Sequence, residues 1–108
     1  MKGLWVLGFI LGFPPAVQAK GNPDNGKAKA AQVCAACHGP DGNKPSAPDQ
    51  PILAGQHYDY LVRALTDYKT GARANPIMKG FASQLSAKDI EDLAAWFASR
   101  KSPLHDQR

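Results

Sequence analysis

Residues 32–42 read QVCAACHGPDG and contain both cysteines of the 108-residue chain. Cys34 and Cys37 are separated by two residues, and His38 follows the second cysteine directly. Four chemistries use such a group: a disulfide bond, a redox-active dithiol, a zinc site, or covalent attachment of haem. The choice among them bears on the fold, because a bound metal or haem would form part of the core.

The first 19 residues are predicted to be a secretory signal peptide. Lys2 gives a positive start, residues 3–13 are uncharged and mostly apolar, and the small residues Val17 and Ala19 lie where a signal peptidase requires them. The apolar run is about half of the ~20 residues that a membrane-spanning helix needs. We therefore expect cleavage after Ala19, export of the mature chain, and no stable membrane insertion of it.

Residues 20–108 are expected to form a single domain. A domain of this size supplies only ~3–5 kcal/mol of net stability unless a metal, a cofactor or a disulfide contributes. The formal net charge of the whole chain is +4. This charge is compatible with an anionic protein partner, but it is too weak and too dispersed to indicate nucleic-acid binding.

Three segments are predicted to be helices, and no segment has the alternation typical of a strand. The helices cover about residues 24–36, about residues 56–69, and a segment that begins at the N-cap Ser86. The apolar face of the third helix consists of Ile90, Leu93, Trp96 and Phe97. The loops over residues 39–55 and 71–84 are long for so small a domain, which indicates that they enclose something or carry function. The predicted fold is all-α, with three main helices and two long loops.

Covalent haem attachment accounts for all three residues of the group. A zinc site needs four ligands, and His57 and His105 do not form a second pair. A redox dithiol opens a helix after a strand, whereas this pair closes a helix. A disulfide across two residues closes a very small loop and stabilises little. Thioether bonds from Cys34 and Cys37 to the haem vinyl groups, with His38 on the iron, match the attachment signature of c-type haem.

Met78 is the candidate for the other axial iron ligand, and it is the one methionine after residue 19. A methionine commonly fills a core, but a thioether opposite His38 would give the His/Met pair of electron-transfer haems. His57 is the rival ligand; it starts a helix beside polar residues and is expected to be exposed. His105 lies in a polar tail and is expected to be solvated.

From residue 20 onwards the sequence resembles the class I c-type cytochromes over its whole length. The segment GKAKAAQVCAACHG (26–39) is similar to the N-terminal helix and haem site of that family, and NPIMKG (75–80) to its methionine loop. The segments LAGQHYDYL (53–61) and YKTGARANPIM (68–78) resemble bacterial periplasmic cytochromes most, including the repeat unit of two-haem members. With one attachment motif, the chain is similar to a single such unit.

The resemblance implies two further contacts. Gly26 matches a glycine that the family packs against an aromatic residue of the C-terminal helix, and the matching aromatic residue is Trp96. Pro51, in PILAG (51–55), matches a proline whose carbonyl accepts a hydrogen bond from the second nitrogen of the histidine ligand, which would fix the orientation of His38. The chain departs from the mitochondrial-type pattern at Ala30, where those proteins have a bulky aromatic residue.

The expected function is that of a soluble, monomeric periplasmic electron carrier, not an enzyme, with one covalent haem c and its iron between His38 and Met78. Redox proteins are the expected partners, docking transiently at an exposed haem edge that Lys44 and Lys79 are expected to flank. Two alternatives stay open: a haem c subunit of a larger oxidoreductase, and a haem-based ligand-binding sensor in which Met78 does not hold the iron.

Overall fold

The computed structural model describes residues 21–48 and 50–102, and within these residues the chain forms helices and no strand. The helices are α1 (Pro23–Val33), α2 (Ala35–His38), α3 (Tyr58–Thr70), α4 (Pro76–Ala82) and α5 (Ala87–Ala98). The all-α prediction is confirmed, with two short helices in addition to the three expected. The predicted signal peptide, its cleavage after Ala19 and the tail with His105 lie outside the described residues.

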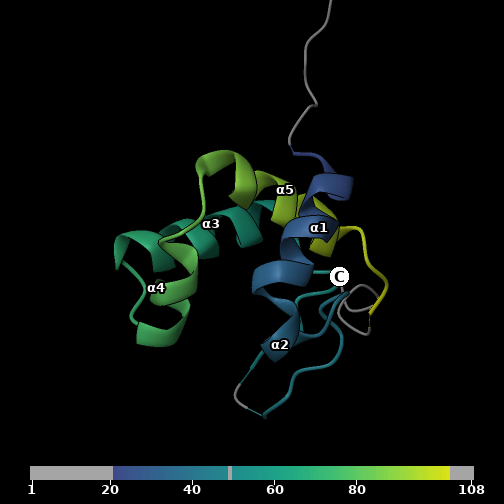
Figure 1. Ribbon diagram of the computed structural model, residues 1–108, viewed down its shortest axis with the longest axis horizontal. Helices are drawn as coiled ribbons and strands as arrows, with labels where there is room; N and C mark the ends of the chain where they lie inside the picture. The colour runs from purple at the N-terminus through teal and green to yellow at the C-terminus, as the bar shows by residue number, and fades with distance from the viewer. Residues whose placement is uncertain (1–20, 49, 103–108) are drawn as a thin grey trace, which may run out of the picture.

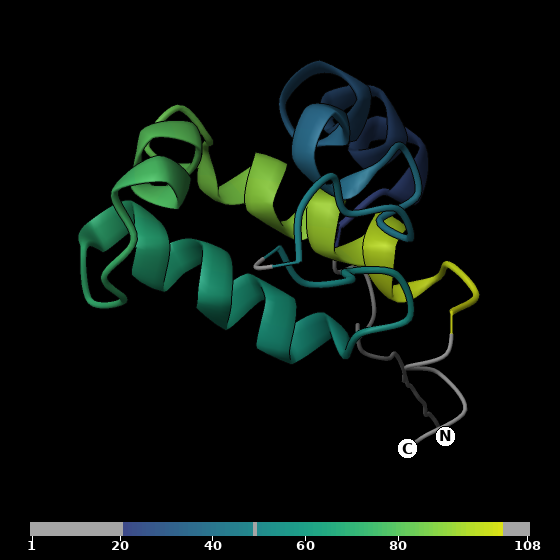
Figure 2. The same cartoon turned by 90° about the horizontal axis from the view of Figure 1, so that it is seen from below.

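Helix α5 is the centre of the fold. It packs against both α1 and α3, and α4 packs against α3. Figures 1 and 2 show α1 and α2 at one end of the fold and α4 at the other, with the long segment between α2 and α3 looping below α1 in Figure 1. The two ends of the molecule are therefore joined mainly through α3 and α5.

The contact between α1 and α5 depends on Gly26. A Cβ atom at this position would lie 2.0 Å from the carbonyl oxygen of Asp92 and 2.8 Å from the Cβ of Trp96. No side chain fits in that space, so only glycine lets the two helices approach this closely. The expected contact between Gly26 and Trp96 is confirmed, and Ala30, one turn further along α1, is completely buried.

The hydrophobic core is small and is built mainly by α5. All four residues of the predicted apolar face are buried: Ile90, Leu93, Trp96 and Phe97. Among the described residues, Leu93 alone is a large side chain with less than 2 % exposure. A core of this size is what we expect of a domain whose stability depends on an additional buried group.

The predicted first helix, residues 24–36, was wrong in one respect: it is broken at Cys34. Helix α1 ends at Val33, because Cys34 has φ −115° and ψ −31° and so leaves the helical path. The chain then forms the single turn α2, in which the carbonyl of Cys34 accepts hydrogen bonds from the backbone N–H groups of Cys37 (3.3 Å) and His38 (3.0 Å). Gly39, with a positive φ of 85°, ends α2.

The loop predicted over residues 71–84 contains the seven-residue helix α4, so the prediction of a continuous loop was wrong. The helix forms because the side chain of Asn75 caps it and Pro76, at the first helical position, has the φ angle that a helix needs. Met78 is consequently a helical residue, not a loop residue.

The start of α5 agrees with its prediction. The Ser86 hydroxyl accepts a hydrogen bond from the backbone N–H of Asp89, and the Asp89 carboxylate accepts one from the backbone N–H of Ser86, both at 3.0 Å. This reciprocal arrangement is a capping box. Among the described residues no helix is both long and apolar enough to span a membrane.

Candidate functional site

Cys34 and Cys37 lie on one turn of chain at the junction of α1 and α2, and both thiols are half-buried and unpaired. Burial raises the pKa of the Cys34 thiol to about 11, and the neighbouring Cys37 adds to the increase. Redox-active dithiols need a thiol with a lowered pKa. Cys34 has the opposite property, so the structure does not favour a thiol–disulfide redox site.

His38 is buried directly after the two cysteines, with only 6 % of its surface exposed. Its Nδ1 lies 2.9 Å from the carbonyl oxygen of Pro51. A carbonyl can only accept, so Nδ1 carries the hydrogen and donates it, which leaves Nε2 with a free lone pair. The hydrogen bond that the resemblance implied is thus present, while binding of His38 to iron stays a prediction.

The loop after α2 is shaped to bring Pro51 to His38. Close to its start, the backbone N–H of Lys44 donates to the carbonyl of His38 (3.1 Å) and that of Ser46 to the carbonyl of Cys37 (2.9 Å). Gly42, with φ 82°, accepts from Leu53 at 2.9 Å and closes the base of the loop. Short backbone bonds of this kind hold a loop without regular structure in one shape.

Two further contacts, which the sequence interpretation missed, attach this loop to α5. The indole N–H of Trp96 donates to the carbonyl of Pro40 (3.1 Å), and the backbone N–H of Gly55 donates to the carbonyl of Phe97 (2.8 Å). The Trp96 ring also lies 4.0 Å from the guanidinium of Arg100. Nothing in the spacing of Pro40 and Trp96 indicated their bond, because it joins segments 56 residues apart.

Met78 lies on α4, at a distance along the fold from α2 in both views (Figures 1 and 2). Its side chain is half-buried, and its backbone N–H donates to the side-chain oxygen of Asn75 at 3.1 Å. The structure therefore groups Cys34, Cys37, His38 and Pro51 together and places Met78 on a separate element.

The rival ligand His57 is exposed, and its side chain makes no capping bond at the start of α3. His105, which is expected to be solvated, lies outside the described residues. Across the described part of the chain, no three side chains of the His, Cys, Asp and Glu types are placed to hold a metal ion directly.

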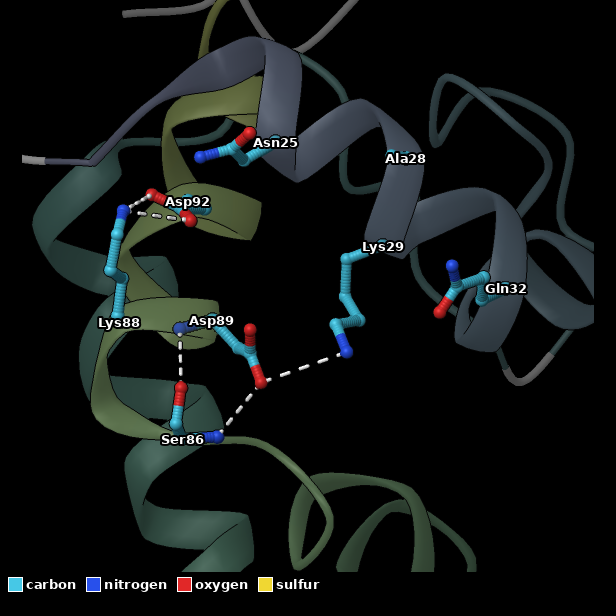
Figure 3. A pocket seen from close by; sticks show the side chains of 8 residues that line it. All are labelled: Asn25, Ala28, Lys29, Gln32, Ser86, Lys88, Asp89 and Asp92. Atoms are coloured by element: carbon cyan, nitrogen blue, oxygen red, sulfur yellow. Dashed lines mark hydrogen bonds and ion pairs between the residues drawn. The ribbon is translucent and has the colours of Figure 1, made fainter.

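A pocket of about 340 Å³ lies between α1 and α5, and neither cysteine lines it (Figure 3). It is lined by Asn25, Ala28, Lys29, Gln32, Ser86, Lys88, Asp89 and Asp92. The charged side chains in it pair with one another: Lys88 with the buried carboxylate of Asp92 at 3.1 Å, and Lys29 with Asp89 at 3.8 Å. Asp92 also accepts from the backbone N–H of Asn22 at 2.7 Å, so its role is to fasten the start of α1 to α5.

Comparison with known proteins places the chain in a family. Residues 21–97 match the family model described as "Cytochrome C oxidase, cbb3-type, subunit III". Cytochrome c4 of Pseudomonas aeruginosa is 48 % identical over 84 % of this chain and 44 % of its own length, and cytochrome c4 of Thiocapsa roseopersicina is 45 % identical over 85 % and 47 %. The crystal structure of reduced recombinant cytochrome c4 from Pseudomonas stutzeri superposes with a TM-score of 0.69 at 43 % identity, over 75 % of this chain and 46 % of that one.

The chain belongs to the cytochrome c family, whose members carry a covalently bound haem c. It spans about half the length of the cytochrome c4 relatives that it matches.

The residues of this chain fit that cofactor. The two thiols are unpaired and lie on one turn, so both are available for thioether bonds. The donor nitrogen of His38 is occupied by Pro51, which leaves the second ring nitrogen for iron. The small core of the polypeptide also leaves a role for a large apolar group.

Proposed function

We propose that the protein is a periplasmic one-electron carrier whose haem c is held by Cys34, Cys37 and His38, with Met78 as the second axial ligand. The observation that carries the proposal is the 2.9 Å hydrogen bond from Nδ1 of buried His38 to the carbonyl of Pro51, beside two unpaired cysteines. This hydrogen bond orients the ring through one nitrogen, so that the other nitrogen would be the one to bind the iron.

Each residue of the site has a distinct task. Cys34 and Cys37 tether the haem, and His38 supplies a neutral imidazole nitrogen whose direction and basicity Pro51 sets. When bound, the haem supplies the ferrous–ferric couple. The thioether of Met78 is a soft ligand that favours ferrous iron and raises the reduction potential. Because His38 and Met78 would serve as ligands in both oxidation states, little movement of the protein would accompany electron transfer.

The proposal of a periplasmic location rests on the signal-like pattern of residues 1–19. The proposal that the protein is a carrier, not an enzyme, rests on the site itself. The residues around His38 supply two tethers, one ligand and one backbone acceptor, and the charged groups of the α1–α5 pocket are paired with one another.

Redox proteins with an acidic face are the proposed partners. The segment of residues 68–82, which includes α4, contains three basic residues and no acidic one. Lys44 and Lys79 are exposed, as are the apolar side chains of Ile77 and Phe81 on α4. Exposed basic residues, together with exposed apolar side chains on α4, support transient docking that is steered by charge, with the protein as a monomer between encounters.

A second candidate function is that of a haem c subunit in a larger oxidoreductase. It is favoured by the family model, whose description is that of an oxidase subunit. The two functions share the same haem chemistry, and purification without detergent or cross-linker distinguishes them, because a subunit would be recovered with its complex.

The absorption spectrum of the purified holoprotein tests the proposed function. We expect the ferric protein to show the weak red charge-transfer band of a sulfur–iron bond, and the ferrous protein to resist carbon monoxide. If the band is absent at neutral pH and carbon monoxide binds readily, Met78 is not an axial ligand. A haem-based ligand-binding sensor would then be the better description.

A further inference from the structure

Asn75 holds the backbone of the methionine proposed to bind iron. Its side-chain oxygen accepts hydrogen bonds from the backbone N–H groups of Ile77 and Met78, both at 3.1 Å. Pro76, between them in sequence, has no N–H to satisfy. One side chain thus satisfies the first two backbone donors of α4, and one of these two donors belongs to Met78 itself.

Little else fixes the position of α4. Of its seven residues only Ala82 is buried, and the side chain of Ile77 is 69 % exposed. The helix lies at the end of the fold, against α3 (Figures 1 and 2). A helix of this length is not stable by itself, so its hydrogen-bonded ends determine whether its first turn stays formed.

Besides the cap, the first turn of α4 has the backbone bond from the Lys79 N–H to the Asn75 carbonyl at 2.8 Å, and the remaining side-chain bonds act away from Met78. The side chains of Ser83 (3.1 Å) and Gln84 (3.2 Å) donate to the carbonyl of Gly80, at the C-terminal end. The Lys79 ammonium donates to the carbonyl of Lys69 at 3.4 Å, a long bond on the exposed surface. If Asn75 lost its side-chain cap, the first turn would keep only the backbone bond between Lys79 and Asn75 and would fray more readily, while the last turn stayed in place.

We propose that Asn75 is a positioning residue for Met78: its cap keeps the first turn of α4 formed and thereby keeps the thioether on the iron. This inference rests on the proposed function, in which Met78 is an axial ligand. In this inference the first turn of α4 frays only when the Met78 thioether leaves the iron. The free energy of the cap therefore adds to that of the sulfur–iron bond.

The chain contains a matched control. Asn22 caps α1 in the same way, with its side-chain oxygen accepting from the backbone N–H groups of Asp24 (2.8 Å) and Asn25 (3.2 Å), and Pro23 follows it. Helix α1 packs along α5 and contributes no axial ligand. The substitutions Asn75→Ala and Asn22→Ala therefore remove the same chemistry from two helices, only one of which carries Met78.

Imidazole, which competes with the methionine for ferric iron, is the probe. A cap contributes about 1 kcal/mol, which corresponds to roughly a fivefold change in an equilibrium constant. We expect the ferric holoprotein with Asn75→Ala to bind imidazole about fivefold more tightly than the wild type. Asn22→Ala should bind it as the wild type does, and Asn75→Ser, which restores a good cap, should return the affinity to the wild-type value.

Several results would overturn the inference. One is a wild type that shows the sulfur–iron band together with an Asn75→Ala variant whose imidazole affinity stays within twofold of the Asn22→Ala variant; Met78 would then be a ligand that Asn75 does not position. A wild type without the band would overturn this inference and the proposed axial ligand together. If Asn75→Ala does not fold, amide hydrogen exchange on the wild-type holoprotein decides: a Met78 amide exchanging as fast as an unprotected one contradicts the cap, and a protected one supports it.

Discussion

His38 and Met78 lie in parts of the molecule that are built in different ways. His38 is buried, the loop that follows it is hydrogen-bonded to α2 and α5, and α1 packs closely on α5 at Gly26. Met78 lies on a short helix with one buried residue and a capped start. The region around His38 is therefore fixed by packing together with many backbone hydrogen bonds, whereas the region around Met78 is fixed by a few hydrogen bonds at the ends of α4.

Without the haem, the region around His38 and the region around Met78 should both lose their structure. Cys34→Ala combined with Cys37→Ala, expressed without haem, should be largely unfolded, because short helices and a small core are marginal without the buried macrocycle. Circular dichroism during heating measures this. A cooperative transition from native-like helicity would show that the polypeptide carries its own core.

Two glycine substitutions compare the two regions directly. A Cβ at Gly26 would lie 2.0 Å from a backbone oxygen of α5, whereas a Cβ at Gly80 on α4 meets no atom within 4 Å. Gly26→Ala should reduce the free energy of unfolding by ~3 kcal/mol, at the upper end of the usual cost of overpacking. Gly80→Ala should be neutral or raise it by up to ~1 kcal/mol, since alanine favours helix. Denaturant unfolding of the two holoproteins measures both, and equal losses would contradict the comparison.

Met78→Ala tests the region around Met78 alone. The variant should lose the red charge-transfer band, bind carbon monoxide when reduced, and have a lower reduction potential, because a ligand that favours ferrous iron is gone. Denaturing gel electrophoresis should still find the haem on the polypeptide, since Cys34 and Cys37 hold it independently. Retention of the band would exclude Met78 as the sulfur ligand, whereas a wild type without the band would return His57 to consideration.

Docking should depend on the region around Met78 more than on the face between α1 and α5. Electron-transfer rates with a negatively charged partner should fall as the Debye length shrinks from ~30 to ~10 Å. Lys79→Gln should weaken that salt dependence. Lys29→Gln, which removes the same charge from the pocket of Figure 3, should leave it unchanged. Equal slopes for the two variants, or a rate that does not respond to salt, would contradict a basic docking face around α4.

The smallest expected effect concerns the capping box of α5. The backbone N–H of Ser86 holds the pKa of the Asp89 carboxyl below its usual value. The folded state therefore favours the ionised carboxylate; this stabilisation is complete above the usual Asp pKa and is lost as pH falls through the lowered value. Asp89→Asn should reduce the free energy of unfolding by about 0.5 kcal/mol near pH 7. In acid the variant and the wild type should become equally stable. A stability difference between the two proteins that is constant with pH would show that the charge of Asp89 is not involved.

The parts of the fold that sequence predicted well are those with a local signal. Ser86 followed by Asp89 predicted the start of α5, and the apolar spacing predicted its buried face. The break at Cys34 and the helix α4 were missed, because each depends on one residue acting against the average preference of its segment. The dipeptide Asn75–Pro76 was a usable signal for α4: Asn22–Pro23 begins α1 in the same way.

The site was predictable to the extent that its residues are adjacent in sequence. Cys34, Cys37 and His38 form one motif, and Pro51 was reached only through the resemblance. The bond from Trp96 to Pro40 was beyond sequence reasoning, because only the folded chain brings α5 to the loop. The position of Met78 relative to His38 depends on the packing of α3 and α5 between them, which no local pattern specifies.

The indole of Trp96 gives the molecule a built-in optical reporter. After residue 19 the chain contains no other tryptophan, and this one is bound to the loop that follows His38. A haem held beside that loop would quench the fluorescence of the indole by energy transfer. The folded holoprotein should therefore show almost no tryptophan fluorescence. Emission should appear only when the chain expands or when the haem is missing, and its intensity would follow both events without an added label.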